Sequence, residues 1–285
     1  MAGAAVLAAE GRWRAHRSRR RRNLALGGAL FLAAMFGAGW VGDVSLARLV
    51  RGLPLAWDYI HRTLPDLALA TLGHDIAYWM WGFEDWVALL GDTLLMAYAG
   101  TVMGGAVALL LSFPAATTLA PAWVVSCTRR VLEFLRTVPT LVLALVFVYA
   151  FGLGAFAGVL AIAAHSAGAL GKLFAEEHEN TAPGPVEAVR AAGGSWAAQM
   201  RFGVLPQSLP GVLSYGLLRF EINVREASVL GLVGAGGIGE ELYLAVRQFE
   251  YQDISAILVL ILLTVAAIDL LCGRLRARVL GGRAA

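Results

Sequence analysis

Five charged or strongly polar side chains lie close together in an otherwise apolar segment, residues 209–230. They are Arg219, Glu221, Asn223, Arg225 and Glu226. At 100° per residue, Arg219, Asn223 and Glu226 share one face of a helix, whereas Glu221 and Arg225 share roughly the opposite face. A charge at mid-membrane costs about 2.5–3.5 kcal/mol, so such groups seldom face lipid. We therefore expect a central helix with protein or a water-filled path on both sides.

The charges on the two faces suggest different roles. Glu221 and Arg225 have the i,i+4 spacing of an ion pair that would lock a helix bundle. Arg219 has no acidic residue four positions away, so it is the better candidate to attract an anion in transit. The alternative is a structural pairing of Arg219 with a helix that carries Asp92 or Asp269.

A glycine-rich run follows this polar segment, and Gly234, Gly236, Gly237 and Gly239 are its candidate gate residues. Irregular backbone at membrane depth persists only where it is buried or lines a cavity. Backbone N–H groups there could bind an anion, and a tight turn for close helix packing is the alternative. The same spacing matches a dinucleotide fingerprint, which would suggest a membrane-bound oxidoreductase. That fingerprint requires a preceding strand, and a membrane-length apolar segment stands there instead.

The elements that carry these residues must lie in a membrane. The chain has 285 residues, of which 59% are hydrophobic and 15% charged, against about 45–50% and 25% in soluble domains. We predict an all-α integral membrane protein with six transmembrane helices at about 20 residues per crossing. The predicted spans are residues 24–41, 87–113, 139–151, 156–174, 209–230 and 254–272.

Arginine placement sets the predicted orientation. Seven arginines lie between Arg12 and Arg22, and three more occur in residues 274–278. Six crossings put every arginine-rich flank in the cytoplasm, together with both termini, as the positive-inside rule requires. Basic runs can also bind nucleic acid, but these border apolar segments, which favours a juxtamembrane role and no nucleic acid partner.

The predicted organisation has five parts. They are a basic cytoplasmic N-terminus at 1–22, a first transmembrane helix at 23–42, a periplasmic or interfacial amphipathic segment at 43–86, a membrane core at 87–273 with a cytoplasmic loop at 175–206, and a basic cytoplasmic tail at 274–285. Cys127 and Cys272 show no metal-ligand spacing, so we interpret both as packing residues and predict no metal and no cofactor. His165 stands alone in its span and is interpreted as a packed, hydrogen-bonded histidine.

The cytoplasmic loop has the start and stop signals of two short helices that form a hairpin. Pro183-Gly184-Pro185 would open a short helix and Gly193-Gly194 would close it. Ser195 would cap a second short helix through Phe202, which ends before Pro206.

This loop resembles that of ABC importer permeases in Glu187-Ala188, in Gly193 six residues after the glutamate, and in Leu205-Pro206. Gly203 departs from the pattern, which usually has a larger aliphatic residue there. The resemblance implies a coupling helix that docks into a groove of an ATP-hydrolysing subunit, with Glu187 and Arg190 as polar contacts and Ala188 allowing close approach. The alternative is a plain surface hairpin.

Over residues 90–279 the chain resembles the phosphonate-type permeases. The resemblance is carried by the segments Gly152-Leu153-Gly154, Gly184-Pro185-Val186-Glu187, Arg219-Phe220-Glu221, Asn223-Val224-Arg225 and Gly231-Leu232-Val233-Gly234-Ala235-Gly236-Gly237-Ile238-Gly239. Glu226 departs from it, because the pattern tends to have a small residue there. Methionine-type permeases are similar around the glycine run and are the nearest alternative.

This resemblance implies a type I ABC importer permease fold in the bacterial inner membrane. It also implies two copies of this chain around one pathway, two copies of an ATP-binding subunit, and a periplasmic substrate-binding protein. The expected cargo is phosphonate or a related phosphorus oxyanion such as phosphate or phosphite. The chain has no P-loop and is expected to have no catalytic site of its own. An ATP-independent secondary transporter is a further alternative, but it leaves the cytoplasmic loop unexplained.

Overall fold

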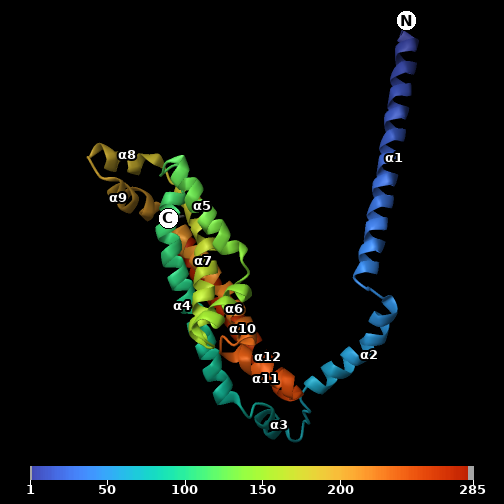
Figure 1. The fold of residues 1–285 in the computed structure, drawn as a ribbon, viewed down its shortest axis with the longest axis vertical. Coiled ribbons are helices and arrows are strands. Elements are labelled where there is room, and N and C mark those ends of the chain that lie inside the picture. Colours follow the sequence, from blue (N-terminus) through green and yellow to red (C-terminus); the bar gives the residue numbers. More distant parts are fainter. Residues whose placement is uncertain (1, 282–285) are drawn as a thin grey trace. The chain divides into compact units, whose positions relative to one another are not determined.

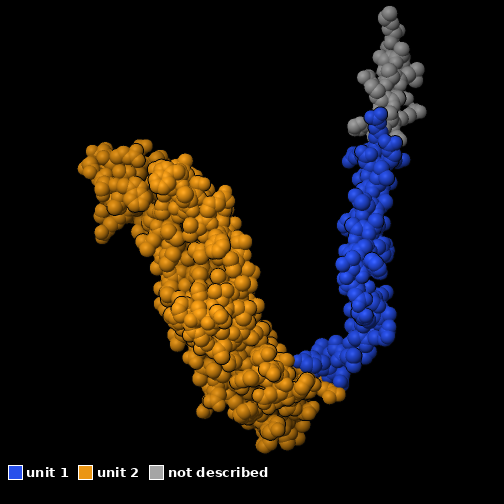
Figure 2. All heavy atoms as spheres, viewed as in Figure 1, with its two compact units in different colours: residues 1–61 blue, residues 62–285 orange. Residues whose placement is uncertain are grey.

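The computed structural model describes the backbone of residues 2–281 and the side chains of residues 13, 17 and 19–281, and the ordered elements of these residues are all helices (Figure 1). The helices are α1 (Ala2–Val41), α2 (Leu46–Thr63), α3 (Leu72–Trp79), α4 (Phe83–Ala115), α5 (Ala122–Thr137), α6 (Thr140–Phe151), α7 (Ala155–Glu179), α8 (Pro183–Ala191), α9 (Trp196–Ala198), the π-helix η1 (Gln199–Val204), α10 (Leu205–Leu230), the 3-10 helix η2 (Gly231–Val233), α11 (Ile238–Gln248) and α12 (Tyr251–Gly281). The chain divides into two compact units, residues 1–61 and 62–285 (Figure 2).

The first unit contains α1 and most of α2. The segment Arg19–Val41 of α1 is long and apolar enough to cross a membrane, and it includes the first predicted span. α2 is amphipathic and buries none of its residues. Its position at the membrane interface remains a prediction. Those parts of the predicted N-terminus and tail that fall on residues 1 and 282–285 lie outside the described residues.

The second unit supplies the other spans. α4, α7 and α12 are each long and apolar enough to cross, and two bent helix pairs qualify if each pair is one span. The described part of the chain therefore has four candidate spans, or up to six with the bent pairs. Six is the number predicted from the sequence.

The third predicted span, residues 139–151, differs from the structure. α6 has 12 residues, about 18 Å of helix, which is too short for a hydrocarbon core of about 30 Å. α5 precedes it and the two helices are bent by 86°. Val138 is extended at the break, because the proline that follows it disfavours a helical conformation.

α7 occupies the centre of the second unit and packs against α4, α5, α6 and α10. Small residues permit these close crossings, as is usual where helices meet in lipid. A Cβ on Gly104 of α4 would meet the Ala163 carbonyl oxygen at 2.6 Å, and one on Gly168 of α7 would meet the Leu132 carbonyl oxygen at 2.6 Å. The hydrophobic core beside these contacts includes Ile162 and Leu230.

The predicted end of the second loop helix before Pro206 is wrong. The helix continues from α9 through η1 directly into α10, so the fifth membrane helix begins at Leu205 rather than at residue 209. A proline in a helix clashes with the carbonyl four residues earlier. For Pro206 that residue is Phe202, which lies in the wider π turn of η1. This turn lets the chain stay helical where ordinary spacing would break it.

Candidate functional site

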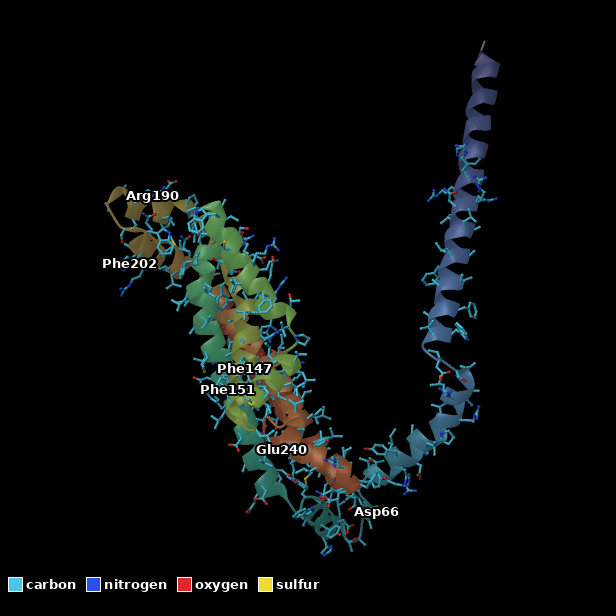
Figure 3. The ribbon with its side chains drawn as sticks, viewed as in Figure 1. Asp66, Phe147, Phe151, Arg190, Phe202 and Glu240 are labelled. Carbon is cyan, nitrogen blue, oxygen red and sulfur yellow. The ribbon has the colours of Figure 1, made fainter. Side chains whose placement is uncertain are left out.

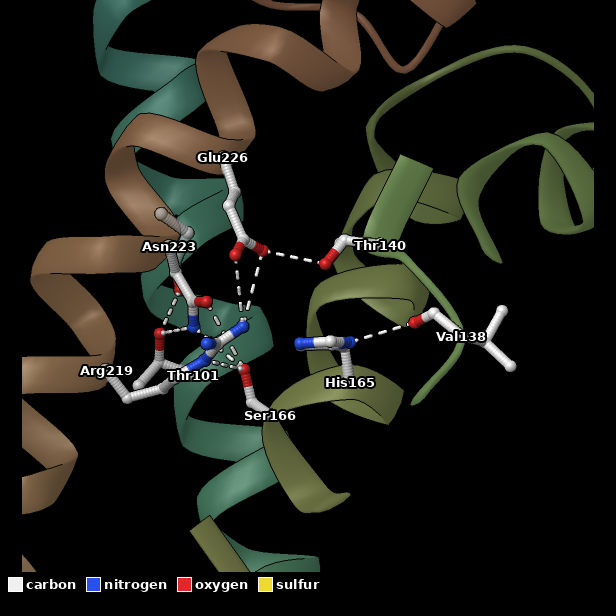
Figure 4. Close-up of polar contacts among 9 residues, drawn as sticks. Thr101, Val138, Thr140, His165, Ser166, Arg219, Asn223 and Glu226 are labelled. Carbon is white, nitrogen blue, oxygen red and sulfur yellow. Dashed lines mark hydrogen bonds and ion pairs between the residues drawn. The ribbon is translucent and has the colours of Figure 1, made fainter. Parts of the chain in front are cut away.

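A buried polar cluster lies where α10 meets α4, α6 and α7 (Figure 4). Its members are Thr101, Thr140, Ser166, Arg219, Asn223 and Glu226. Arg219, Asn223 and Glu226 come from the shared face of α10 predicted from the sequence. The other three residues are hydroxyl side chains from the neighbouring helices.

Arg219 has an acidic partner in this cluster, although none lies four residues away. Its Nη2 is 3.3 Å from Oε2 of Glu226, seven residues later on the same face, and its Nε donates to Ser166 Oγ at 3.1 Å. The Arg219 side chain is 10% exposed and that of Glu226 is 29% exposed. The described contacts thus pair Arg219 with its own helix. Asp92 is exposed, and Asp269 Oδ1 is buried without a described hydrogen-bond partner.

Asn223 and Glu226 connect α10 to three other helices. The fully buried Asn223 amide donates to Thr101 Oγ1 on α4 at 2.7 Å and to Ser166 Oγ on α7 at 2.9 Å. Glu226 accepts a hydrogen bond of 2.8 Å from Thr140 Oγ1 on α6. Because buried polar groups are costly unless bonded, these contacts specify how α10 is rotated against its neighbours.

The other polar face of α10 carries the expected ion pair. Arg225 Nη2 lies 3.4 Å from Glu221 Oε1, and Arg276 on α12 reaches Glu221 Oε2 at 3.0 Å. Glu221 thus joins α10 to α12. Arg225 is about half exposed and borders an open groove of about 350 Å³, lined by Thr140, Leu141, Arg225, Glu226, Val229 and Leu230.

The glycine run forms an irregular turn between α10 and α11. Gly234, Gly236 and Gly237 have φ between 74° and 81°, a region that side chains other than glycine rarely adopt. The Gly154 N–H donates to the Gly234 carbonyl at 2.8 Å, which joins this turn to the one between α6 and α7. Gly239 lies in backbone contact with Ser228 and Gly231, an arrangement that supports the close-packing alternative. A gating role remains a prediction.

The predicted hairpin lies at the end of the bundle opposite α11, as the labels Arg190 and Glu240 show (Figure 3). α8 exposes Glu187, Ala188 and Arg190, and Gly193 follows it with φ 79°. The Ser195 side chain caps the next helix by accepting from the Ala198 N–H at 3.3 Å, as expected.

The inner side of the hairpin explains why residue 203 is glycine. A Cβ on Gly203 would meet Val186 Cα at 2.9 Å, so a larger residue would force α8 away from η1. Leu205 and Pro206 begin α10, and Gln207 joins the two ends of the hairpin. Its side chain accepts from the Ala182 N–H at 3.1 Å and donates to the Ala182 carbonyl at 3.2 Å.

Other predicted features take simple positions. His165 Nδ1 lies 3.0 Å from the Val138 carbonyl oxygen, so this histidine is hydrogen-bonded as predicted. Cys272 is buried, but Cys127 is exposed, which corrects its interpretation as a packing residue. Residues 122–137 form an amphipathic helix, and a cysteine on its outer face does not pack. No group of three or more metal-ligating side chains occurs among the described residues.

Sequence reasoning missed the hydroxyl partners in the polar cluster, Thr101, Thr140 and Ser166. Serine and threonine can bond to the carbonyl of their own helix, as Thr101 also does with Ala97 at 2.6 Å, so their presence in a span is no specific signal. The shared helix face of Arg219 and Glu226 carried a usable signal for the ion pair between these two residues, which was not among the predicted contacts.

Comparison with known proteins identifies the family. Residues 108–280 match the binding-protein-dependent transport system inner membrane components. The phosphite transport system permease protein PtxC of Stutzerimonas stutzeri is 38% identical over 248 residues, which cover 87% of this chain and 86% of the relative. The phosphate-import permease protein PhnE of Mycolicibacterium smegmatis is 41% identical over 198 residues, covering 66% of this chain and 37% of that relative.

Solved structures share the fold. An inward-facing structure of the MetNI methionine ABC transporter gives a TM-score of 0.60 at 23% identity and covers 70% of this chain and 97% of that chain. An amino acid ABC transporter with histidines gives 0.55 at 18% identity, with coverage of 70% and 98%. The second unit therefore has the type I ABC importer permease fold. The chain belongs to the family of binding-protein-dependent transport system inner membrane components, the permeases of ABC transporters.

Proposed function

We propose that this chain forms the translocation path of an ATP-driven importer for a phosphorus oxyanion such as phosphite, phosphonate or phosphate. The relatives named as phosphite and phosphate permeases support this cargo class. Two copies of the chain would enclose the path, with two ATP-binding subunits on the cytoplasmic side and a substrate-binding protein on the periplasmic side. The ATPase is a separate chain, and the permease itself has no catalytic role.

The hairpin at residues 183–204 is the observation that carries this proposal. Its first helix exposes Glu187, Ala188 and Arg190, which together offer a small, polar surface to a partner. The contact of Gly203 with Val186 fixes its inner side, and the hydrogen bond between Ala182 and Gln207 joins its two ends. An exposed hairpin can bind an ATP-hydrolysing subunit. Because this hairpin is firmly attached to the membrane helices, it can also pass the movement of that subunit on to them.

The path itself would run beside α10, where the half-exposed Arg225 borders the open groove. Arg225 is the better candidate to meet an anion in transit, because its side chain is about half exposed and its partner Glu221 is shared with Arg276, whereas the Arg219 side chain is 10% exposed and paired with Glu226. The glycine turn joined through Gly154 and Gly234 would close the path at the outer end. The glycines of both turns can change conformation at low steric cost because they lack a Cβ.

ATP hydrolysis by the reconstituted complex tests the proposal. The complex of chain, ATPase and binding protein is compared for the wild type, Glu187→Ala and Gly193→Trp across phosphite, phosphonate, phosphate and methionine. We expect loaded binding protein to stimulate hydrolysis only with phosphorus oxyanions, and both variants to lose that stimulation. The control is Glu176→Ala, an exposed glutamate of α7 at the same end of the bundle, which should behave as wild type.

Three results would contradict parts of the proposal. Stimulation by methionine and by no phosphorus oxyanion would remove the proposed cargo. Undiminished stimulation in both hairpin variants would mean that residues 183–204 do not transmit the signal. Uptake by the chain without any ATPase would favour a secondary transporter.

A further inference from the structure

A second buried polar chain lies at the base of the hairpin and has no part in the cluster around Arg219. Its members are Ser112 at the end of α4, His178 at the end of α7 and Ser208 in the first turns of α10, each at most 1% exposed. Ser112 Oγ is 2.9 Å from His178 Nε2, and His178 Nδ1 is 2.9 Å from Ser208 Oγ. One imidazole ring thus bridges three helices at one depth.

The histidine can satisfy both serines at once. A neutral imidazole has one donor and one acceptor nitrogen, so His178 donates to one of the two serines and accepts from the other. Each serine hydroxyl also lies within hydrogen-bond distance of a preceding backbone carbonyl, Ser112 Oγ at 2.7 Å from the Leu109 oxygen and Ser208 Oγ at 3.2 Å from the Val204 oxygen. The serine that accepts from the imidazole can therefore donate its own proton to that carbonyl, and a fully bonded buried network of this kind specifies one arrangement of its side chains.

Aromatic packing extends the connection into the hairpin. The Phe113 ring stacks on the His178 ring with centroids 4.5 Å apart and planes 4° apart. The Phe113 ring also meets the ring of Trp196, the first residue of α9, edge-on with centroids 6.5 Å apart. The Trp196 indole N–H donates to the Leu119 carbonyl at 3.0 Å, so the hairpin also holds the segment between α4 and α5.

Glu179, the residue after His178, adds further bonds at the base of the hairpin. Glu179 accepts from the Thr117 N–H at 2.5 Å and from Arg129 of α5 at 2.7 Å. The π-helix η1 ends the hairpin at Val204, four residues before Ser208 of α10, and π turns within helices are frequent at functional sites. A displacement of the hairpin therefore meets side-chain connections to α4, α5, α7 and α10 at this level.

We propose that the Ser112–His178–Ser208 chain, with Phe113 and Trp196, is the junction through which movement of the hairpin reaches the membrane helices. This inference rests on the proposed function, because it concerns how the hairpin's motion is passed on. His178 acts as a positioning residue: its two hydrogen bonds hold the ends of α4, α7 and α10 at fixed positions relative to one another. Phe113 contacts both His178 and Trp196 and so connects these three helix ends to the hairpin.

The experiment measures ATP hydrolysis by the full complex with and without loaded binding protein. His178→Phe keeps a ring for stacking on Phe113 and removes both hydrogen bonds, while each serine retains a backbone carbonyl to bond. We expect the stimulation factor to fall by at least about fivefold, the low end of coupling between sites, with basal hydrolysis preserved. His178→Gln and His178→Asn can each replace one of the two bonds and should restore part of the stimulation.

Two further variants guard against a simple folding defect. Ser112→Ala combined with Ser208→Ala leaves His178 and its stack intact, and it should lower stimulation as His178→Phe does. Ser255→Ala, a buried serine at the opposite end of the bundle, should leave the stimulation factor unchanged.

The outcomes separate this inference from the proposed function. A wild-type complex that is not stimulated by any loaded binding protein would count against the proposed function itself. A stimulated wild type with equal stimulation in His178→Phe and in the double serine variant would overturn the junction. Equal losses in Ser255→Ala would also overturn it, since they would indicate general destabilisation.

Discussion

At the residue scale, the polar side chains of α10 divide into two groups. Arg219, Asn223 and Glu226 are bonded inside the bundle, whereas Arg225 is about half exposed at a groove. Removing one partner of a buried pair leaves the other charge uncompensated, which costs more than removing both partners. Stability measurements can therefore distinguish a structural ion pair from an arginine that attracts an anion.

Arg219 and Glu226 are predicted to act as one unit. Glu226→Gln should lower the free energy of unfolding by about 1–3 kcal/mol, because it leaves the buried Arg219 charge without its partner. Arg219→Gln should lower it by less, because the Glu226 carboxylate that remains is partly exposed at the groove. The double variant should recover at least half of the summed loss, since no buried charge then stands unpaired. Thermal unfolding in detergent measures all three variants. Additive losses in the double variant would show that the two charges do not interact.

At the element scale, the packing of α4 against α7 depends on a close crossing at small residues. α4 and α7 approach so closely at Gly104 that a methyl group would meet backbone. The neighbouring Gly105 has its nearest atom, Leu170 Cδ1, at 3.9 Å. Two adjacent glycines of the same helix thus have opposite steric surroundings.

These two glycines form a matched pair for a stability test. Gly104→Ala should destabilise the chain by about 1–3 kcal/mol, because the methyl group must push α7 away. Gly105→Ala should be neutral or stabilise by up to about 1 kcal/mol, because alanine favours the helix. Unfolding in detergent, followed by intrinsic tryptophan fluorescence, compares the two. Equal effects would mean that α4 and α7 do not cross at Gly104.

At the whole-molecule scale, the helices of the second unit place the hairpin and the glycine turns at opposite ends of the bundle. The hairpin with α8 lies at one end, and the glycine turns with α11 lie at the other (Figures 1 and 3). α7 has 25 residues between them, about 38 Å of helix, which exceeds the hydrocarbon core of about 30 Å. We therefore expect the hairpin and the glycine turns to face opposite sides of the membrane.

Cysteine labelling tests this orientation. Single cysteines are placed at Leu153, which is 79% exposed in the turn between α6 and α7, and at the exposed Ala192 of the hairpin, in a chain carrying Cys127→Ser and Cys272→Ser. We expect a membrane-impermeant maleimide to label Leu153→Cys in intact spheroplasts. Ala192→Cys should react only after the membrane is opened. Labelling of both positions from outside would exclude a cytoplasmic hairpin.

The sequence by itself determined the features that depend on local geometry. Helix period placed Arg219, Asn223 and Glu226 on one face, and the apolar lengths and arginine flanks predicted six crossings, where the structure has four candidate spans or up to six with the bent pairs. The hairpin's start, its Gly193 stop and its Ser195 cap also follow from short-range hydrogen bonding and backbone preference. The resemblance to permeases rested on the same segments, and the family match confirmed it.

Only the tertiary structure decided which groups meet across helices. The Thr140, Ser166 and Thr101 hydroxyls become partners of α10 because close glycine and alanine crossings set the rotation and depth of each helix. The π turn that carries the helix through Pro206 also depends on packing, since Gly203 must fit against Val186. Hydrophobic pattern specifies that a helix spans, but many rotations bury the same apolar surface. The polar bonds and steric contacts between helices select one of them.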